Sequence, residues 1–447
     1  MNLTHPSLFR KQCYVNGHWI DSATKQTMDV INPANGAILG TVPSLTQEDT
    51  RKAIEAAQLA LAEWSKLPAK RRSQLIRRWF ELCMENQNDL AAILTFEQGK
   101  PLKESLGEIT YGSAFLEWFA EEAKRVYGDI IPAASADRRI LVIKQPVGVV
   151  AAITPWNFPN AMITRKAGAA LAAGCTIVIK PPSSTPYSAL ALAELASQAG
   201  IPPGVLNVVT GNSTVVGTEL TTNSIVRKLS FTGSTEVGKH LMEQCAGTVK
   251  KVSMELGGNA PFIVFDDADL DQAVAGAIAS KFRNAGQTCV CANRIFVQDG
   301  IYDIFAEKLK QAVLALRVGE GWTENVDIGP LIDQAAVNKV NQHIENAISG
   351  GARLLCGGRT HELGGLFFEP SILVHVTRDA LLMYEERFRP VAPLIRLSSE
   401  QEVIELANDT PFGLAAYFYT SDYQRSWRVA EALETGIIGL NEGIIST

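Results

Sequence analysis

Cys289 is the residue whose setting in this sequence is best suited to covalent chemistry. It lies in the run Ala-Gly-Gln-Thr-Cys-Val-Cys, residues 285–291, so a second thiol, Cys291, follows two positions later. A thiol attacks as the thiolate, and because an ordinary cysteine has a pKa of about 8.5, it needs a base at neutral pH. No histidine is close to Cys289 in the sequence, whereas Glu255 stands just before two glycines, residues 257 and 258. The residue types predict a Glu–Cys pair, with a cysteine hydrolase or esterase as an alternative.

The length and composition of the chain indicate what kind of protein must position such a site. At 447 residues it is long enough for two or three domains, and 46% hydrophobic with 20% charged residues is typical of a folded globular protein. A formal net charge of −6 gives no electrostatic footprint for nucleic acid. The basic residues between 70 and 78 are therefore interpreted as one solvated helix face. No metal site is expected.

Cysteine usage and apolar runs indicate the compartment. Seven cysteines, an odd number spread along the chain, favour reduced thiols and a cytoplasmic location. The first residues, Met-Asn-Leu-Thr-His-Pro, lack the basic and apolar regions of a secretory signal. Apolar runs are broken well before the ~18 residues that a membrane-spanning helix needs. We therefore expect a cytoplasmic protein without a membrane span.

Hydrophobic periodicity predicts two successive α/β regions. Turn signals at 16–17 and 35–36 predict hairpins, and a helical period runs from 47 to 123. From 146 to 252, apolar runs alternate with helices, which is typical of a doubly wound parallel sheet that binds ligands outside the carboxyl ends of its strands. The expected strands there are 147–153, 176–179, 205–209 and 228–231, and the expected helices are 164–173, 187–199 and 213–220. A second series runs from 261 to about 418, with 392–397 and 414–419 as later strands.

Five motifs in order give the chain a resemblance to a known family. Besides residues 285–295 and Met-Glu-Leu-Gly-Gly-Asn at 254–259, they are Thr-Pro-Trp-Asn-Phe-Pro at 154–159, Lys-Pro-Pro-Ser at 180–183 and Phe-Thr-Gly-Ser-Thr-Glu-Val-Gly at 231–238. Together they resemble the aldehyde dehydrogenase superfamily over nearly the whole chain. The resemblance implies an α/β fold of two doubly wound Rossmann-like domains with a protruding β-hairpin oligomerisation arm.

The same resemblance implies a division of the chain. The dinucleotide-binding domain would comprise residues 1–124 and 146–252, the oligomerisation hairpin 125–145, and the catalytic domain 253–430. Residues 431–447 would form a truncated return toward the active site. The family continues through a loop, a helix and a strand that joins a neighbouring subunit's sheet. We therefore expect a homo-oligomer, a dimer or tetramer, weakened by the lack of that strand.

Catalytic roles also follow from the resemblance. Cys289 would attack the aldehyde carbonyl to give a thiohemiacetal, and Asn157 with the Cys289 backbone N–H would stabilise the oxyanion. One such donor is typically worth ~3–4 kcal/mol. Hydride transfer to a nicotinamide would leave a thioester. Glu255, expected to be partly buried between apolar neighbours, would activate the cysteine, the hydrolytic water or both. Cys291 is a candidate redox switch with the nucleophile, or simply a small buried residue.

Cofactor contacts are expected at the other motifs. The pattern from Gly233 matches Gly-x4-Gly-Lys, but His240 stands where an ATP-binding loop needs Ser or Thr, which argues against ATP binding. A strand-to-helix turn with two glycines can place a cofactor phosphate near a helix N-terminus, and the alternative is a turn that only packs. In the resembled family, lysine at the position of Lys180 contacts the adenosine ribose, and the residue three positions on selects the cofactor. That residue is Ser183, which can donate to a 2′-phosphate, so NADP is favoured and NAD is the alternative. The expected cofactor-binding residues are Trp156, Asn157, Lys180, Pro181, Pro182, Ser183, Gly233, Ser234, Leu256 and Glu386.

Two arginines predict the substrate class. Arg165 and Arg283 lie near catalytic segments among apolar or small residues, where a guanidinium can hold a carboxylate by charge-assisted hydrogen bonds. The segments 161–166, 281–284 and 441–446 resemble those of bacterial NADP-preferring succinate-semialdehyde dehydrogenases. This implies that Arg165, Arg283 and Ser446 bind the distal carboxylate of succinic semialdehyde, in 4-aminobutyrate degradation. The alternatives are a structural salt bridge for either arginine, and glutarate semialdehyde as substrate.

One motif departs from the family. The family's Glu-x-Phe-Gly-Pro appears here as Glu386-Arg387-Phe388-Arg389-Pro390, so Arg389 replaces a glycine whose backbone freedom is expected to be needed. Glu386 would contact the nicotinamide ribose if its aim is preserved. The substitution predicts slow turnover. It also keeps open a non-catalytic homologue that binds nucleotide or partner subunits.

Overall fold

The computed structural model describes residues 2–386 and 388–446, and the chain divides into two compact units. The first unit comprises Met1–Asn32, Ala37–Gln98 and Ser105–Glu255, and the second comprises Pro33–Gly36, Gly99–Glu104 and Leu256–Thr447. Two short early segments, 33–36 and 99–104, thus pack with the second unit, whereas the sequence-based division placed them in the first. Arg387, in the motif that departs from the family, lies outside the described residues.

A seven-stranded sheet with the order β11-β10-β7-β8-β9-β1-β2 forms the centre of the first unit. Its parallel strands are β7 (Val149–Ile153), β8 (Thr176–Lys180), β9 (Leu206–Val208), β10 (Val226–Thr232) and β11 (Lys251–Glu255). The antiparallel edge strands are β1 (Cys13–Val15) and β2 (His18–Ile20), which are joined at the turn expected at 16–17. A separate antiparallel pair consists of β3 (Thr27–Ile31) and β4 (Ile38–Pro43).

In the part of the chain that the structure describes, eight helices belong mainly to this unit, and α1, α5, α6, α7 and α8 pack against its sheet. They are α1 (Gln47–Trp64), α2 (Ala69–Glu85), α3 (Gln87–Gln98), α4 (Leu102–Glu122), α5 (Ala161–Ala172), α6 (Tyr187–Gln198), α7 (Ser213–Thr222) and α8 (Thr235–Ala246). Helix α1 begins with a reciprocal capping box between Thr46 and Asp49. Helix α5 begins earlier than expected because Glu108 accepts hydrogen bonds from the N–H groups of Asn160 and Ala161, which satisfies the first donors of the helix.

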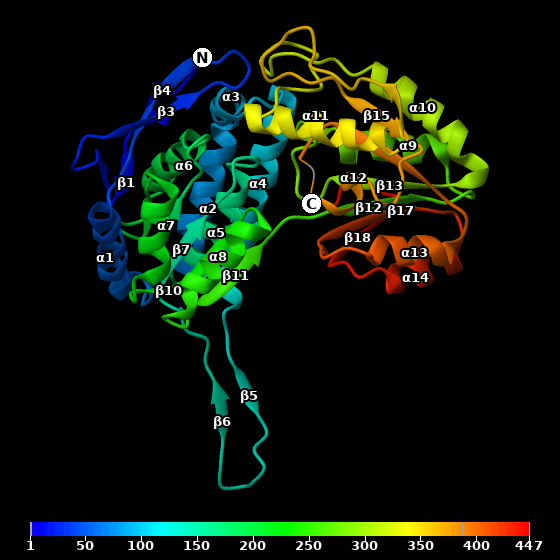
Figure 1. Ribbon diagram of the computed structural model, residues 1–447. Coiled ribbons are helices and arrows are strands. Elements are labelled where there is room, and N and C mark those ends of the chain that lie inside the picture. The colour runs from blue at the N-terminus through cyan, green and yellow to red at the C-terminus, as the bar shows by residue number, and fades with distance from the viewer. Residues whose placement is uncertain (1, 387, 447) are drawn as a thin grey trace. The chain divides into compact units, whose positions relative to one another are not determined.

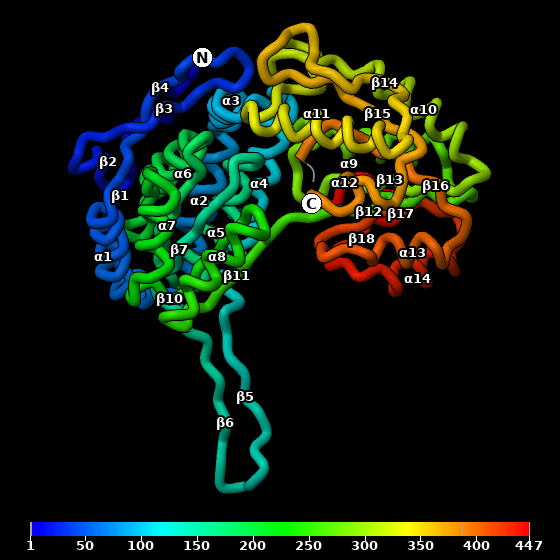
Figure 2. The backbone as a smooth tube through the Cα atoms, viewed as in Figure 1, coloured from blue at the N-terminus to red at the C-terminus, as the bar shows by residue number. Residues whose placement is uncertain are grey.

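A two-stranded arm projects from the rest of the first unit. It consists of β5 (Asp129–Ile131) and β6 (Ile140–Val142), paired antiparallel, and the two lengths of chain run side by side (Figures 1 and 2). Apolar side chains on the arm are exposed, including Ile130, which is 80% exposed, and Leu141, which is 68% exposed. The protruding β-hairpin expected at 125–145 is therefore present.

The second unit has its own seven-stranded sheet with the order β14-β15-β16-β13-β12-β17-β18. These strands are β12 (Ala260–Val264), β13 (Ala292–Gln298), β14 (Arg353–Cys356), β15 (Ser371–Val374), β16 (Val391–Leu397), β17 (Ala415–Tyr419) and β18 (Ile437–Leu440). The helices are α9 (Leu270–Lys281), α10 (Tyr302–Leu314), α11 (Gln334–Ser349), α12 (Leu381–Tyr384), α13 (Glu400–Asn408) and α14 (Tyr423–Ala432). Short 3-10 turns are η1 (Pro6–Leu8), η2 (Ala123–Arg125), η3 (Arg283–Gly286) and η4 (Asp299–Ile301).

Both sheets are mixed, because an antiparallel hairpin extends one edge of the first and β14 lies antiparallel to β15 in the second. The predicted α/β fold with two doubly wound sheets and a hairpin arm is confirmed, with antiparallel edge strands added. Within the described residues, every helix is too short or too polar to cross a lipid bilayer.

Candidate active site

In the first unit, the residues expected to bind the cofactor gather at the carboxyl ends of parallel strands. The segment 154–157 follows β7, Lys180 ends β8, and Gly233 follows β10. Strand β7 is central among them, since Ile153 is paired with Lys180 on one side and with Phe231 on the other. Ligands of α/β sheets bind at this edge, so the topology makes it the candidate site for a dinucleotide.

Three buried polar side chains lie at this edge, and two of them have no hydrogen-bond partner among the described residues. Lys180 is buried, and its Nζ donates to the carbonyl oxygen of Pro181 over 3.2 Å. Burial lowers the pKa of Lys180 to about 8. The hydroxyls of Thr154 and Thr232 are also buried, with no hydrogen-bond partner among the described residues. A buried ammonium and two unsatisfied hydroxyls fit a ligand rich in oxygen acceptors, as the ribose and phosphates of a dinucleotide are.

The glycine motif forms the start of a helix. Ser234 is the N-cap of α8 and accepts a hydrogen bond from the N–H of Val237 over 3.3 Å. Gly233 donates its N–H to the carbonyl oxygen of Glu255 over 3.1 Å, which ties this turn to the end of β11. Helix N-termini attract anionic groups such as phosphates. Ser183 and Trp156 are half-buried in the loops after β8 and β7.

Glu255 is exposed, which corrects the expectation of partial burial. The reason is topological: β11 is the edge strand of the first sheet and pairs only with β10, so its apolar neighbours do not cover the carboxylate. Lys166 on α5 interacts electrostatically with the Glu255 carboxylate. Its Nζ donates to Ser230 Oγ over 3.0 Å, and burial lowers its pKa to about 8 although Glu255 acts to raise it.

Arg165 is held by aromatic rings rather than by an acid. Its Nη2 donates to the hydroxyl of Tyr111, and its Cζ lies 4.5 Å from the ring centroid of Phe115. Its Nε is buried without a hydrogen-bond partner, and no carboxylate pairs with Arg165 among the described residues. The alternative of a structural salt bridge is therefore not found for Arg165. Asn157 is buried in the loop that precedes the same helix.

In the second unit, a left-handed turn presents Cys289. Asn284 and Ala285 have φ values of 51° and 55°, and Gly286 follows with φ 74°. A Cβ on Gly286 would overlap the carbonyl oxygen of Arg389, so only glycine fits. The side chain of Gln287 then closes the turn, because its Nε2 donates to Asn284 O over 3.0 Å and its Oε1 accepts from the N–H of Ile332 over 3.0 Å. Cys289 emerges half-buried.

Glu386 packs directly beside the nucleophile segment. Its Oε1 accepts from the N–H of Gly258 over 3.1 Å, and a Cβ on Gly258 would overlap the carbonyl oxygen of Cys289. Burial raises the pKa of Glu386 to about 7, against the opposing effects of the Gly258 N–H and of Arg389. Arg389 does not have a positive φ, and its Nε donates to Ala336 O over 3.1 Å. The expectation that this position needs the freedom of glycine is therefore wrong.

Cys291 lies behind the nucleophile in a polar but closed environment. It is 1% exposed, and Nζ of the fully buried Lys281 lies 3.4 Å from its Sγ. The same Nζ donates to Asn293 Oδ1 over 2.9 Å. No disulfide joins any of the seven cysteines, all of which are among the described residues.

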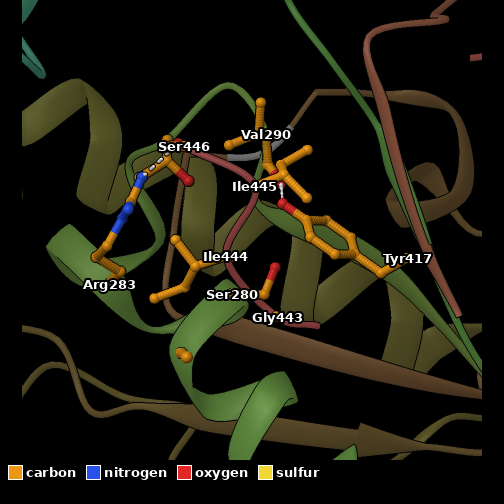
Figure 3. Close-up of a pocket in the computed structure, with 10 residues that line it drawn as sticks. Ser280, Arg283, Val290, Tyr417, Gly443, Ile444, Ile445 and Ser446 are labelled. Carbon is orange, nitrogen blue, oxygen red and sulfur yellow. Dashed lines mark hydrogen bonds between the residues drawn. The ribbon is translucent and has the colours of Figure 1, made fainter. Parts of the chain in front are cut away.

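Arg283 and Ser446 meet in a small pocket next to Cys289. Nη2 of Arg283 donates to Ser446 Oγ over 3.2 Å (Figure 3). Thr288 and Val290, the two neighbours of Cys289, line the same pocket, and the hydroxyl of Tyr417 donates to Val290 O over 2.7 Å. The cavity volume is about 10 Å³, which accommodates about one water-sized group. The pocket therefore suits a terminal polar group of a ligand. Among the described residues, no cluster of His, Cys, Asp or Glu could hold a metal ion.

Comparison with known proteins agrees with this geometry. The model of the aldehyde dehydrogenase family matches residues 19–447, and the chain belongs to this family. It is 63% identical over 446 residues to the NADP(+) succinate-semialdehyde dehydrogenase GabD of Escherichia coli, covering all of this chain and 92% of that protein. It is 64% identical to glutarate-semialdehyde dehydrogenase of Pseudomonas putida, with the same coverage. The crystal structure of an E. coli NADP-dependent enzyme superposes with a TM-score of 0.99 at 63% identity, covering 99% of this chain and 92% of that one.

Proposed function

We propose that this protein oxidises succinate semialdehyde to succinate with NADP⁺, in 4-aminobutyrate degradation. The observation that supports this choice of substrate is the hydrogen bond between Arg283 and Ser446, in a pocket lined by the two neighbours of Cys289. A guanidinium and a hydroxyl that face the same pocket can donate hydrogen bonds to a carboxylate. Arg165, which has a donor to spare, is proposed as the second arginine for that carboxylate.

The chemistry proposed for the chain's own residues follows from their types. Cys289 attacks the aldehyde carbon and becomes bonded to it in a thiohemiacetal, then in a thioester. Asn157 and the Cys289 backbone N–H donate hydrogen bonds to the oxyanion. Glu255, exposed to solvent, takes a proton from the thiol or from the water that hydrolyses the thioester. Bound NADP⁺ supplies the hydride acceptor.

The cofactor residues fit a phosphorylated dinucleotide. Lys180 is proposed to donate to the adenosine ribose, Ser183 to the 2′-phosphate, and the turn at Gly233 and Ser234 to receive the pyrophosphate. Glu386 is proposed to accept from the nicotinamide ribose. A neutral serine at 183 leaves NAD⁺ as a weaker alternative, because no charge there distinguishes the two cofactors strongly.

The test is NADPH formation, followed by absorbance, with purified protein and succinate semialdehyde. We expect turnover with NADP⁺, and none in Cys289→Ala. Hydrolysis of an activated ester without turnover of the aldehyde would instead identify a cysteine hydrolase, and binding of NADP⁺ without turnover would identify a non-catalytic homologue.

Glutarate semialdehyde is the second candidate, because a glutarate-semialdehyde dehydrogenase matches the chain as well as a succinate-semialdehyde dehydrogenase does. The two substrates differ by one methylene, which a pocket distinguishes by about 1–3 kcal/mol. The ratio of kcat/KM for the two semialdehydes decides between them.

The oligomeric state of the protein is inferred from its projecting arm. The exposed apolar residues of the β5–β6 arm support a homo-oligomer, a dimer or tetramer, in which a second subunit covers them. Light scattering after size exclusion, on the wild type and on Leu141→Asp, measures the oligomeric state.

A reactive cysteine at the centre of the mechanism suits the reducing cytoplasm, where we propose that the protein works.

A further inference from the structure

We propose that Glu104 is a positioning residue for the nucleophile: its carboxylate fixes the left-handed turn that presents Cys289. The role assigned to Cys289 rests on the proposed function, but the effect on the turn does not. Glu104 lies in the short segment 99–104 that belongs with the second unit, far in sequence from the turn that it contacts.

Both carboxylate oxygens of Glu104 face one backbone donor. The N–H of Asn284 lies 2.8 Å from Oε2 and 3.1 Å from Oε1. Asn284 is buried, so its N–H is shielded from bulk water. A buried donor left without an acceptor is costly, and the Glu104 carboxyl supplies that acceptor.

The contact falls on the most strained part of the segment. Asn284 begins a run of three left-handed residues, and Ala285, the second, carries a Cβ that this conformation disfavours. Such backbone persists only where its surroundings determine it. Gln287 holds the end of the turn through its side chain, and Glu104 holds its beginning.

The side chain of Glu104 contacts Asn284 rather than the N-terminus of its own helix. It occupies the first turn of α4, where an acid ordinarily interacts with the helix N-terminus, yet both described hydrogen bonds of its side chain go to Asn284. Burial raises its pKa to about 7, opposed by Lys100, the Asn284 N–H, Arg283 and Lys103. The chain thus retains an acid where ionisation is disfavoured, as expected of a group kept for its geometry.

Two substitutions of Glu104 distinguish the effect of side-chain length from the effect of charge. Glu104→Asp keeps the charge but shortens the side chain by one methylene, so the oxygens withdraw from Asn284. Glu104→Gln keeps the length and one acceptor oxygen but removes the charge. Glu121→Asp is the matched control, because Glu121 lies on the same helix with its side chain exposed and paired with Lys124.

The first measurement is the rate at which iodoacetamide alkylates Cys289, followed by peptide mass spectrometry, with kcat/KM measured in parallel. We expect Glu104→Asp to slow both by about tenfold or more, since a displacement of about 1 Å near a reacting group can cost about a hundredfold. Glu104→Gln should stay within about threefold of the wild type, and Glu121→Asp should match it. Wild-type rates in Glu104→Asp would overturn the proposal. So would an equal loss in Glu104→Gln, because charge rather than contact would then be responsible.

A second variant covers the case in which Glu104→Asp folds poorly. Glycine adopts the left-handed region without penalty, so adding Ala285→Gly to Glu104→Asp should recover folding and part of the alkylation rate. Failure to recover either would contradict the positioning role. Slow alkylation in Glu104→Asp together with no aldehyde oxidation by the wild type would leave this role standing and refute the proposed function.

Discussion

Arg283 Nη2 lies 3.2 Å from Ser446 Oγ, and this contact joins the start of η3 to the segment after β18. A neutral hydroxyl is a modest partner for a guanidinium. A substrate carboxylate that reached this pocket would offer a charged acceptor, and charge-assisted hydrogen bonds are roughly twice as strong as neutral ones. We therefore propose that the pair selects aldehydes that carry a second, anionic end.

The two neighbouring thiols should behave differently. Cys289 is half-buried at the end of a constrained turn, whereas Cys291 is closed off beside Lys281. Cys289→Ala should lower kcat by more than about a thousandfold, as removal of a nucleophile does, and leave NADP⁺ binding intact. Cys291→Ala should retain turnover but lose any reversible inactivation by peroxide. Steady-state rates and fluorescence titration with NADPH measure these effects, with Cys356→Ala as the control thiol. Full activity in Cys289→Ala would contradict the mechanism.

Cofactor preference should depend on position 183. Ser183→Glu places a carboxylate where the 2′-phosphate is expected, and like charges repel. The ratio of kcat/KM for NADP⁺ to that for NAD⁺ should fall at least about tenfold, equivalent to about 1.4 kcal/mol. Ser184→Glu, at the next position along the chain, is the matched control and should change the ratio less. An unchanged ratio in Ser183→Glu would show that Ser183 does not contact the phosphate.

Stability should depend on pH through Glu386. Burial raises its pKa to about 7, so the folded protein binds this proton more tightly than the unfolded chain, where an ordinary glutamate has a pKa near 4.5. Its contribution to stability is therefore greatest below about pH 4.5 and is lost as the pH rises toward about 7. Glu386→Gln lacks this loss, so the Tm of the variant minus that of the wild type should increase between pH 5 and pH 8. Thermal unfolding by fluorescence measures it, and a difference that is constant with pH would argue against the raised pKa.

Much of the fold follows from local signals in the sequence. The alternation of apolar runs and helices predicts β7, β8, β9 and β10, because buried parallel strands require continuous apolar stretches. The start of α5 could not be predicted in this way, because it depends on Glu108, an acid from a distant helix that caps Asn160 and Ala161. No pattern in residues 157–164 signals that contact.

The site was predictable where a motif specifies backbone geometry. Gly286 and Gly258 are required because each is packed against a carbonyl oxygen, and both stand in motifs that the sequence shows. Exposure was harder to predict. Glu255 was expected to be partly buried, but its strand lies at the sheet edge, and strand order is not visible in local sequence. That arginine fits at position 389 could not be predicted for a similar reason. Its side chain donates a hydrogen bond to Ala336 O, and this contact depends on how α11 packs.

The most direct test compares succinate semialdehyde with butanal, which has the same carbon chain without the carboxylate, in the wild type, Arg283→Ala and Arg165→Ala. Loss of one charge-assisted hydrogen bond costs about 1.5–3 kcal/mol. Each substitution should therefore lower kcat/KM for succinate semialdehyde at least about tenfold and hardly change it for butanal, while Arg353→Ala, an exposed arginine on β14, should change neither. Equal losses on both aldehydes, or no loss on succinate semialdehyde, would contradict a carboxylate clamp.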